Sequence, residues 1–124
     1  MQPQEIEVWY VLPAIRRDMA KVMKEKGVSQ KSIAKFLGVT EAAVSQYLSG
    51  KRASEFLLNE SILTEIGKST DTIVANPQLI IPETQRLLKL VWKTDLVCKL
   101  HKKYCDYVPE HCSVCARGEH RIPV

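Results

Sequence analysis

Apolar side chains recur every three to four residues along most of the chain, which is the spacing of one face of an α-helix. In the first part they stand at Leu12, Ile15, Met19, Val22 and Met23, opposite Arg16, Arg17, Lys21 and Lys24. Pro13 fits the first turn of such a helix and Gly27 fits its end. Residues 5–12 suit a strand or an apolar helix, and we favour a helix because helical patterns follow them.

A denser pattern lies between residues 29 and 50. Ser29 and Thr40 are typical N-terminal caps, and Gly38 and Gly50 are suited to end helices. We therefore expect short helices at residues 29–37 and 40–49, joined by a tight turn. The residues that then face one core are Ile33, Leu37, Val44, Tyr47 and Leu48, with small Ala34 at the helix crossing and Val39 beneath the turn.

The second half of the chain predicts further helices. A helix over residues 54–67 would bury Phe56, Leu57, Ile62, Leu63 and Ile66. Residues 69–82 are expected to form a connector, because Pro77 and Pro82 interrupt it. Residues 83–104 contain neither Gly nor Pro and predict one long helix. Its apolar face, formed by Leu87, Leu90, Val91, Val97, Leu100 and Tyr104, suits pairing with a second copy or packing on the chain's own domain.

Composition narrows the class of protein. The 124 residues suffice for one domain with a small appendage, and 45% hydrophobic with 26% charged residues is ordinary for a globular protein. No apolar run approaches the roughly 20 residues that span a bilayer, and the first residues lack a secretion signal, so we expect a cytoplasmic protein without membrane contact. The net charge is +4, with basic ends around an acidic middle, which favours a polyanionic partner.

Residues 30–48 carry the pattern of a helix-turn-helix. With Val44, Tyr47 and Leu48 facing the core, the second helix points short polar side chains outward. Gln46 suits an adenine edge, Ala42 a thymine methyl and Ser45 either type of base. The full set expected to contact DNA is Gln30, Lys31, Thr40, Glu41, Ala42, Ser45, Gln46, Ser49, Lys51 and Arg52, the last two as phosphate contacts. The alternative is an ordinary helical hairpin with a solvated polar face.

The stretch SQKSIAKFLGVTEAAVSQYLSGKR closely resembles the Cro/repressor-like (XRE) helix-turn-helix regulators, and the fuller stretch that begins at Val8 resembles an archaeal branch of them. The resemblance covers roughly residues 8–68. It implies an all-α, lambda-repressor-like bundle that binds double-stranded DNA as a homodimer and regulates transcription, with residues 40–49 as the recognition helix. The competing class is an antitoxin-like interaction protein. An enzyme acting on a small-molecule substrate is not expected, since no phosphate-cradling glycine loop or nucleophile–base pair is evident.

The four cysteines stand together near the C-terminus, at Cys98, Cys105, Cys112 and Cys115. Clustered thiols in a cytoplasmic protein indicate metal or redox chemistry rather than structural disulfides. In an unbroken helix the first two would be about 10.5 Å apart along the axis. That separation is too wide for one zinc ion, so we expect the helix to end near Lys103, ahead of Pro109.

Three kinds of cysteine site remain open, besides inert thiols. We favour an iron–sulfur cluster, 4Fe-4S or 2Fe-2S, because a cluster tolerates wider ligand spacing than one ion. A structural zinc would use Cys112 and Cys115 with His101, His111 or His120. A redox thiol pair is the third. With a cluster, the chain would be a redox- or iron-responsive regulator with a DNA-binding domain at residues 1–75, a connector and dimerisation helix at 76–104 and a metal site at 98–118.

Overall fold

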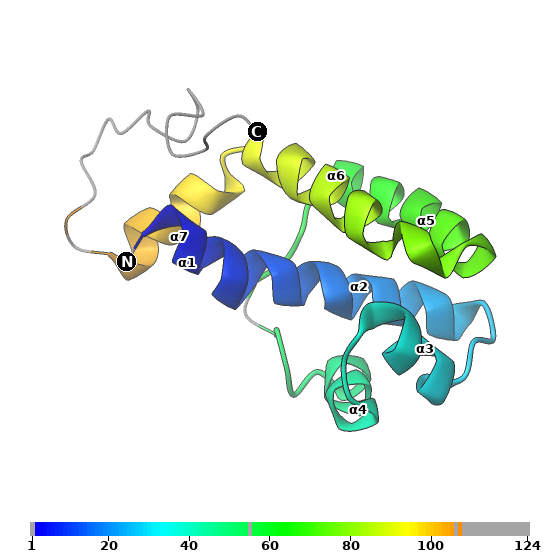
Figure 1. Cartoon of the computed structure of the whole chain (residues 1–124). Helices are drawn as coiled ribbons and strands as arrows, with labels where there is room; N and C mark the ends of the chain where they lie inside the picture. The colour runs from blue at the N-terminus through cyan, green and yellow to red at the C-terminus, as the bar shows by residue number, and fades with distance from the viewer. Residues whose placement is uncertain (1, 55, 106, 108–124) are drawn as a thin grey trace.

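A computed structural model describes residues 2–54, 56–105 and 107. Every element in these residues is helical, which confirms the predicted all-α class. The elements are α1 (Pro3–Ile6), the π-helical turn η1 (Glu7–Val11), α2 (Leu12–Glu25), α3 (Gln30–Leu37), α4 (Glu41–Ser49), α5 (Glu60–Ala75), the 3-10 turn η2 (Pro77–Leu79), α6 (Ile80–Trp92) and α7 (Leu96–Tyr104). Figure 1 shows α2 running through the middle, with α3 and α4 below it and α5 and α6 above.

The first three elements form one continuous helical rod, so the helical interpretation of residues 5–12 is confirmed. Pro13 lies in the first turn of α2, as predicted, but the helical chain continues before it through η1. A proline inside an α-helix removes one backbone donor and clashes with the carbonyl four residues earlier. Here a π-helical turn widens the helix just before Pro13, and the Leu12 amide donates to the Glu7 carbonyl instead. The rod therefore passes the proline without breaking.

The helix expected at residues 54–67 begins and ends later than predicted. Asn59 is its N-cap, with the side-chain oxygen accepting from the Ile62 amide at 3.0 Å. The helix passes through Gly67 to Ala75, so most of the predicted connector is helical. Leu57 is exposed rather than buried, because it lies before the start of the helix. Pro82 lies in the first turn of α6, where a missing amide hydrogen costs little.

The helix predicted over residues 83–104 is two helices with a break at Lys93–Asp95. The Thr94 hydroxyl donates to the Val91 carbonyl at 2.6 Å and accepts from the Leu96 amide at 3.3 Å. Such local bonds compete with the helical ladder and end it. The break lets α7 turn back against α1, and Tyr104 of α7 stacks on Tyr10 of η1 with ring centroids 5.0 Å apart.

Much of the apolar face of α6 and α7 packs on the chain's own domain. Leu87, Val91 and Val97 are fully buried within one chain, and Leu100 is nearly so. They belong to the same core as Ile15 and Val44, so the described residues share one hydrophobic core. The division into a DNA-binding domain and a dimerisation helix stays a prediction.

Arg86 of α6 contacts side chains of α5. Its guanidinium donates to the Glu65 carboxylate at 3.0 Å, to Glu83 at 2.9 Å and to the buried Ser69 hydroxyl at 2.7 Å. The hydrogen bond from Arg86 lowers the pKa of Glu65. These contacts fix α6 against the bundle. No helix in the described residues is long and apolar enough to cross a membrane.

Candidate nucleic-acid interface

Side-chain caps set the ends of α3 and α4 as predicted. The Ser29 hydroxyl accepts from the Ser32 amide at 3.2 Å, and the Thr40 hydroxyl accepts from the Ala43 amide at 3.0 Å. Gly38 closes α3 in the left-handed conformation with φ 69°, which a side chain would strain. The Val39 amide donates back to the Ala34 carbonyl at 3.0 Å, completing a tight turn. The two helices therefore cross as a helix-turn-helix.

The buried and exposed faces of this unit also agree with the sequence. Ile33, Val44 and Tyr47 are buried, while Val39 and Leu48 are half-buried against the same core. The outward face of α4 consists of short polar or small side chains. Of the residues predicted to contact DNA, Lys31, Thr40, Glu41, Ala42, Ser45, Gln46, Ser49, Lys51 and Arg52 are exposed, and Gln30 is half-buried.

Arg52 lies at the end of this surface and contacts Gln46 and Tyr47. Its Nε–H donates to Gln46 Oε1 at 2.8 Å, and its guanidinium lies 5.8 Å from the Tyr47 ring centroid. The backbone amides of Lys51 and Arg52 both donate to the Gln46 carbonyl, at 2.9 and 3.2 Å. Gln46 keeps its amide hydrogens for another partner, and Arg52 keeps its terminal nitrogens. The two residues predicted to contact phosphate and the glutamine predicted to read a base thus form one connected group.

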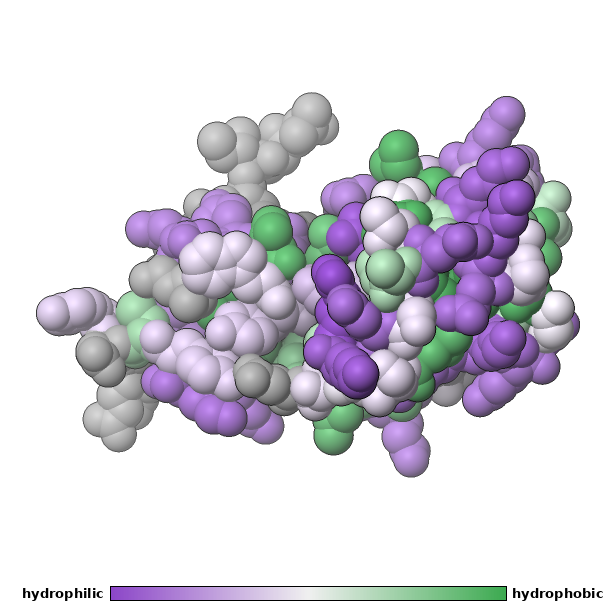
Figure 2. Space-filling view, turned by 90° about the horizontal axis from the view of Figure 1, so that it is seen from below, coloured by the Kyte–Doolittle hydropathy of each residue, from purple (hydrophilic) through white to green (hydrophobic). Residues whose placement is uncertain are grey.

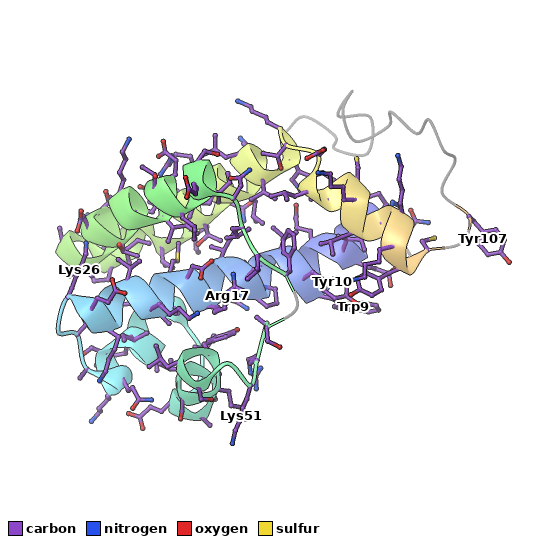
Figure 3. All side chains as sticks on the ribbon, turned by 180° about the vertical axis from the view of Figure 1, so that it is seen from behind. Trp9, Tyr10, Arg17, Lys26, Lys51 and Tyr107 are labelled. Atoms are coloured by element: carbon purple, nitrogen blue, oxygen red, sulfur yellow. The ribbon has the colours of Figure 1, made fainter. Side chains whose placement is uncertain are left out.

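Arg17 is the residue whose role was not predicted, because helical spacing placed it on the solvated face. It is 3% exposed and bonds Asp18 in a bidentate pair at 3.0 and 2.8 Å. Its Nη1 also donates to the carbonyls of Ala53 and Phe56, both at 2.5 Å. In Figure 3, Arg17 lies midway along α2, where the segment leading from α4 to α5 passes. The bond holds that segment directly after Lys51 and Arg52.

Ala53 adopts a backbone conformation that non-glycine residues rarely take. Its φ is 59°, which costs an alanine roughly 1–2 kcal/mol. The carbonyl that Ala53 presents to Arg17 accounts for this conformation. The chain thus turns away from α4 immediately after its basic pair, and Lys51 and Arg52 stay on the outer face.

A second surface adjoins the end of α4. A shallow cavity of about 210 Å³ is lined by Trp9, Tyr10, Lys51 and Phe56, among others. Figure 2, which views the molecule from the side of α3 and α4, shows many hydrophilic side chains across the centre and right, and a paler group toward the end where α1 lies. Trp9 is 56% exposed beside this basic surface, a position that its apolar neighbours in the sequence did not indicate.

The cysteine cluster lies only partly within the described residues. Cys98 is half-buried on α7, and Cys105 follows Tyr104 as the C-cap of that helix, with its amide donating to the His101 carbonyl at 2.9 Å. The helix therefore ends one residue after the predicted Lys103. The predicted ligands Cys112 and Cys115, with His111 and His120, lie outside the described residues.

The helical path from Cys98 to the end of α7 constrains any metal site. Its rise of about 9 Å exceeds the widest spacing of two sulfurs on one zinc ion, about 4.6 Å. In the part of the chain that the structure describes, no group of three or more His, Cys, Asp or Glu side chains is placed to hold a metal ion.

Comparison with protein-family models gives a match over part of the chain. Residues 19–58 match the family model described as helix-turn-helix, which spans the end of α2, both motif helices and the segment bound by Arg17. No curated protein and no solved structure matches the chain. Residues 19–58 are therefore similar to a helix-turn-helix domain, in agreement with the crossed helices α3 and α4.

Proposed function

We propose that this protein is a sequence-specific transcriptional regulator that binds double-stranded DNA with α4 in the major groove. The observation that carries this proposal is the division of α4 into a buried apolar face and an outer face of Ala42, Ser45 and Gln46. Such side chains are short enough to let a helix approach base edges closely, and each has a partner there.

Basic side chains around α4 supply the phosphate contacts. Lys51 and Arg52 follow its C-terminal end, and Lys31 lies at the start of α3, the helix that braces the backbone in this motif. Gln30 and Ser49 add polar contacts at the rim. Glu41 at the start of α4 is suited to accept from a cytosine amino group.

The proposed regulator binds DNA as a homodimer, since one recognition helix reads only a few base pairs and paired half-sites double the contact surface. The apolar face of α6 and α7 is already used within the chain. Pairing would therefore use another surface. Val8 and Trp9 are adjacent apolar side chains, each 56% exposed, that suit such a surface.

Selection of binding sites from random duplex DNA tests this function. We expect an enriched palindromic operator whose half-sites lie about one helical turn apart. Replacing Lys51 with glutamine should weaken binding by a similar factor on every sequence and reduce the salt slope by about 1, because one phosphate contact is lost. Lys93→Gln, an exposed cation between α6 and α7, is the matched control. Weak binding without sequence enrichment or salt dependence would instead favour an interaction protein.

We further propose that the C-terminal cysteines hold a metal–thiolate group that makes the regulator redox- or iron-responsive. Their thiolates suit iron–sulfur clusters and zinc alike, and the wide spacing of Cys98 and Cys105 favours a cluster. A change at the end of α7 has a route to the DNA-binding domain: Tyr104 stacks on Tyr10 of η1, and η1 continues into α2. For both Cys98 and Cys105 to bind one ion, the last turns of α7 would have to open.

Anaerobic purification followed by metal analysis tests the cysteine site. We expect a brown protein that contains iron and acid-labile sulfide and loses both when Cys105 or Cys112 is replaced by serine. A colourless protein with one zinc per chain would support the structural zinc site instead. A protein free of metal after aerobic and anaerobic preparation would contradict both.

A further inference from the structure

An open groove lies between α2, α3 and α6, away from the proposed DNA-contacting face of α4. Its volume is about 370 Å³, which is within the range of small-molecule sites. The walls are largely apolar: Leu12 and Met19 come from α2, Phe36 and Leu37 from α3, and Ile80 and Ile81 from α6. In Figure 1, α6 lies above α2 and α3 below it, so the groove joins the motif to the rest of the bundle.

Part of the apolar surface of this groove is open to solvent. Ile81 is 70% exposed although it lies within a helix packed on the bundle, and Phe36 is half-buried beside it. Clustered apolar side chains at a concave site mark a binding surface, because water contact with them is unfavourable.

The polar side chains of the groove specify the charge of its ligand. Arg16 and Lys35 line it together with Thr84 and Gln85, and none of the described lining residues is acidic. Within the described residues neither cation takes part in an ion pair. Arg16 is half-buried, which strengthens its attraction for an anion relative to a fully hydrated cation. The groove thus combines an apolar wall with two positive charges.

We infer that the groove is an effector site for a small amphipathic anion. The apolar body of such a molecule, an aliphatic chain or aromatic ring, lies on Phe36 and Ile81. Its carboxylate or sulfonate accepts hydrogen bonds from Arg16, whose guanidinium matches the geometry of such groups. The positive charge of Lys35 attracts the same anionic group.

The position of the groove couples it to DNA binding, and this step rests on the proposed function. Leu37 and Gly38, which also line the groove, form the turn that orients α4. A bound anion neutralises two cations next to the motif, which lowers the positive potential that attracts phosphate. Occupancy therefore weakens operator binding, most strongly at low salt.

The ligand site is tested on the full chain without DNA, using the fluorescent probe 1-anilinonaphthalene-8-sulfonate and octanoate as competitor. We expect one saturable site from which octanoate displaces the probe and octylammonium does not. Arg16→Gln and Ile81→Asp should each weaken probe binding by about tenfold or more, because one removes the charged hydrogen bond and the other repels the anion. Lys89→Gln, an exposed cation of α6 outside the groove, should leave it unchanged.

Two results would overturn the ligand site: binding that is equal in the Arg16→Gln and Lys89→Gln proteins, or displacement by octylammonium as well as by octanoate. Circular dichroism of each variant shows whether it is folded. Operator binding with saturating octanoate then tests the coupling. Octanoate binding with unchanged operator affinity would overturn the coupling only, whereas octanoate binding by a protein that selects no operator would overturn the proposed function and leave the site intact.

Discussion

Replacing Arg17 with methionine is expected to lower the free energy of unfolding by about 3–5 kcal/mol. The change leaves the Asp18 carboxylate buried without its partner and removes the donor from two backbone carbonyls. A buried charge without compensation is among the most destabilising results of a single substitution. Urea denaturation followed by circular dichroism measures the effect, and Lys21→Met, an exposed cation on the same helix, should stay within about 0.5 kcal/mol of the native protein.

Two further variants separate the effect of the unpaired Asp18 charge from the effect of the lost hydrogen bonds to the backbone. Arg17→Met combined with Asp18→Leu removes the uncompensated carboxylate and should recover part of the lost stability. The remainder is the cost of leaving the Ala53 and Phe56 carbonyls without a donor. Arg17→Lys should also be destabilising, because an ammonium group cannot match the planar fork that serves Asp18 and both carbonyls at once. A loss below about 1 kcal/mol in Arg17→Met would contradict the role assigned to this side chain.

Replacing Gln46 with alanine is expected to weaken binding to the selected operator by about 10–100-fold, equivalent to about 1–3 kcal/mol, and to abolish base preference at one position of each half-site. Non-specific DNA should bind as before, since Gln46 supplies no positive charge. Quantitative competition binding on operators with single base changes measures both effects. Gln78→Ala, an exposed glutamine on η2, is the matched control. An equal loss on all sequences would show that Gln46 does not read a base.

The hydrogen bond between Arg52 and Gln46 predicts that their contributions are not independent. Arg52→Met should remove the proposed phosphate contact and also free the Gln46 side chain to rotate, which should cost part of its proposed base contact. The double variant should therefore lose less affinity than the sum of the two single variants, with a coupling of about 0.5 kcal/mol or more. Strict additivity would mean that Arg52 acts on phosphate only.

Local chemistry made the motif predictable from the sequence. Ser29, Thr40, Gly38 and Gly50 act within one or two turns of their own position, as caps and left-handed helix ends. The outward face of α4 follows from three buried apolar positions and the helical repeat. The prediction of a polar, exposed Gln46 is therefore confirmed, and the bases it reads stay a prediction.

The predicted helix boundaries were wrong where segments distant in the sequence interact with the backbone or with the core. Residues 54–58 were predicted to be helical, yet the carbonyls of Ala53 and Phe56 bond to Arg17, which stands 36 and 39 residues earlier in the chain. A carbonyl held by that guanidinium does not take part in a helical ladder, so α5 begins only at the next cap, Asn59. Likewise the helix of residues 83–104 breaks at Thr94, which allows Val97 and Leu100 to reach the core.

The sequence by itself determined the helical class, the ends of α3 and α4 and the polar outer face of α4, because caps and periodicity act between near neighbours. Only the tertiary structure decided that Arg17 is buried and binds the backbone after α4, and that the apolar face of α6 and α7 packs inside the chain. It also decided that Arg16 and Lys35 line one apolar groove. Each of these depends on which remote segments meet, and that is set by the packing of the whole core.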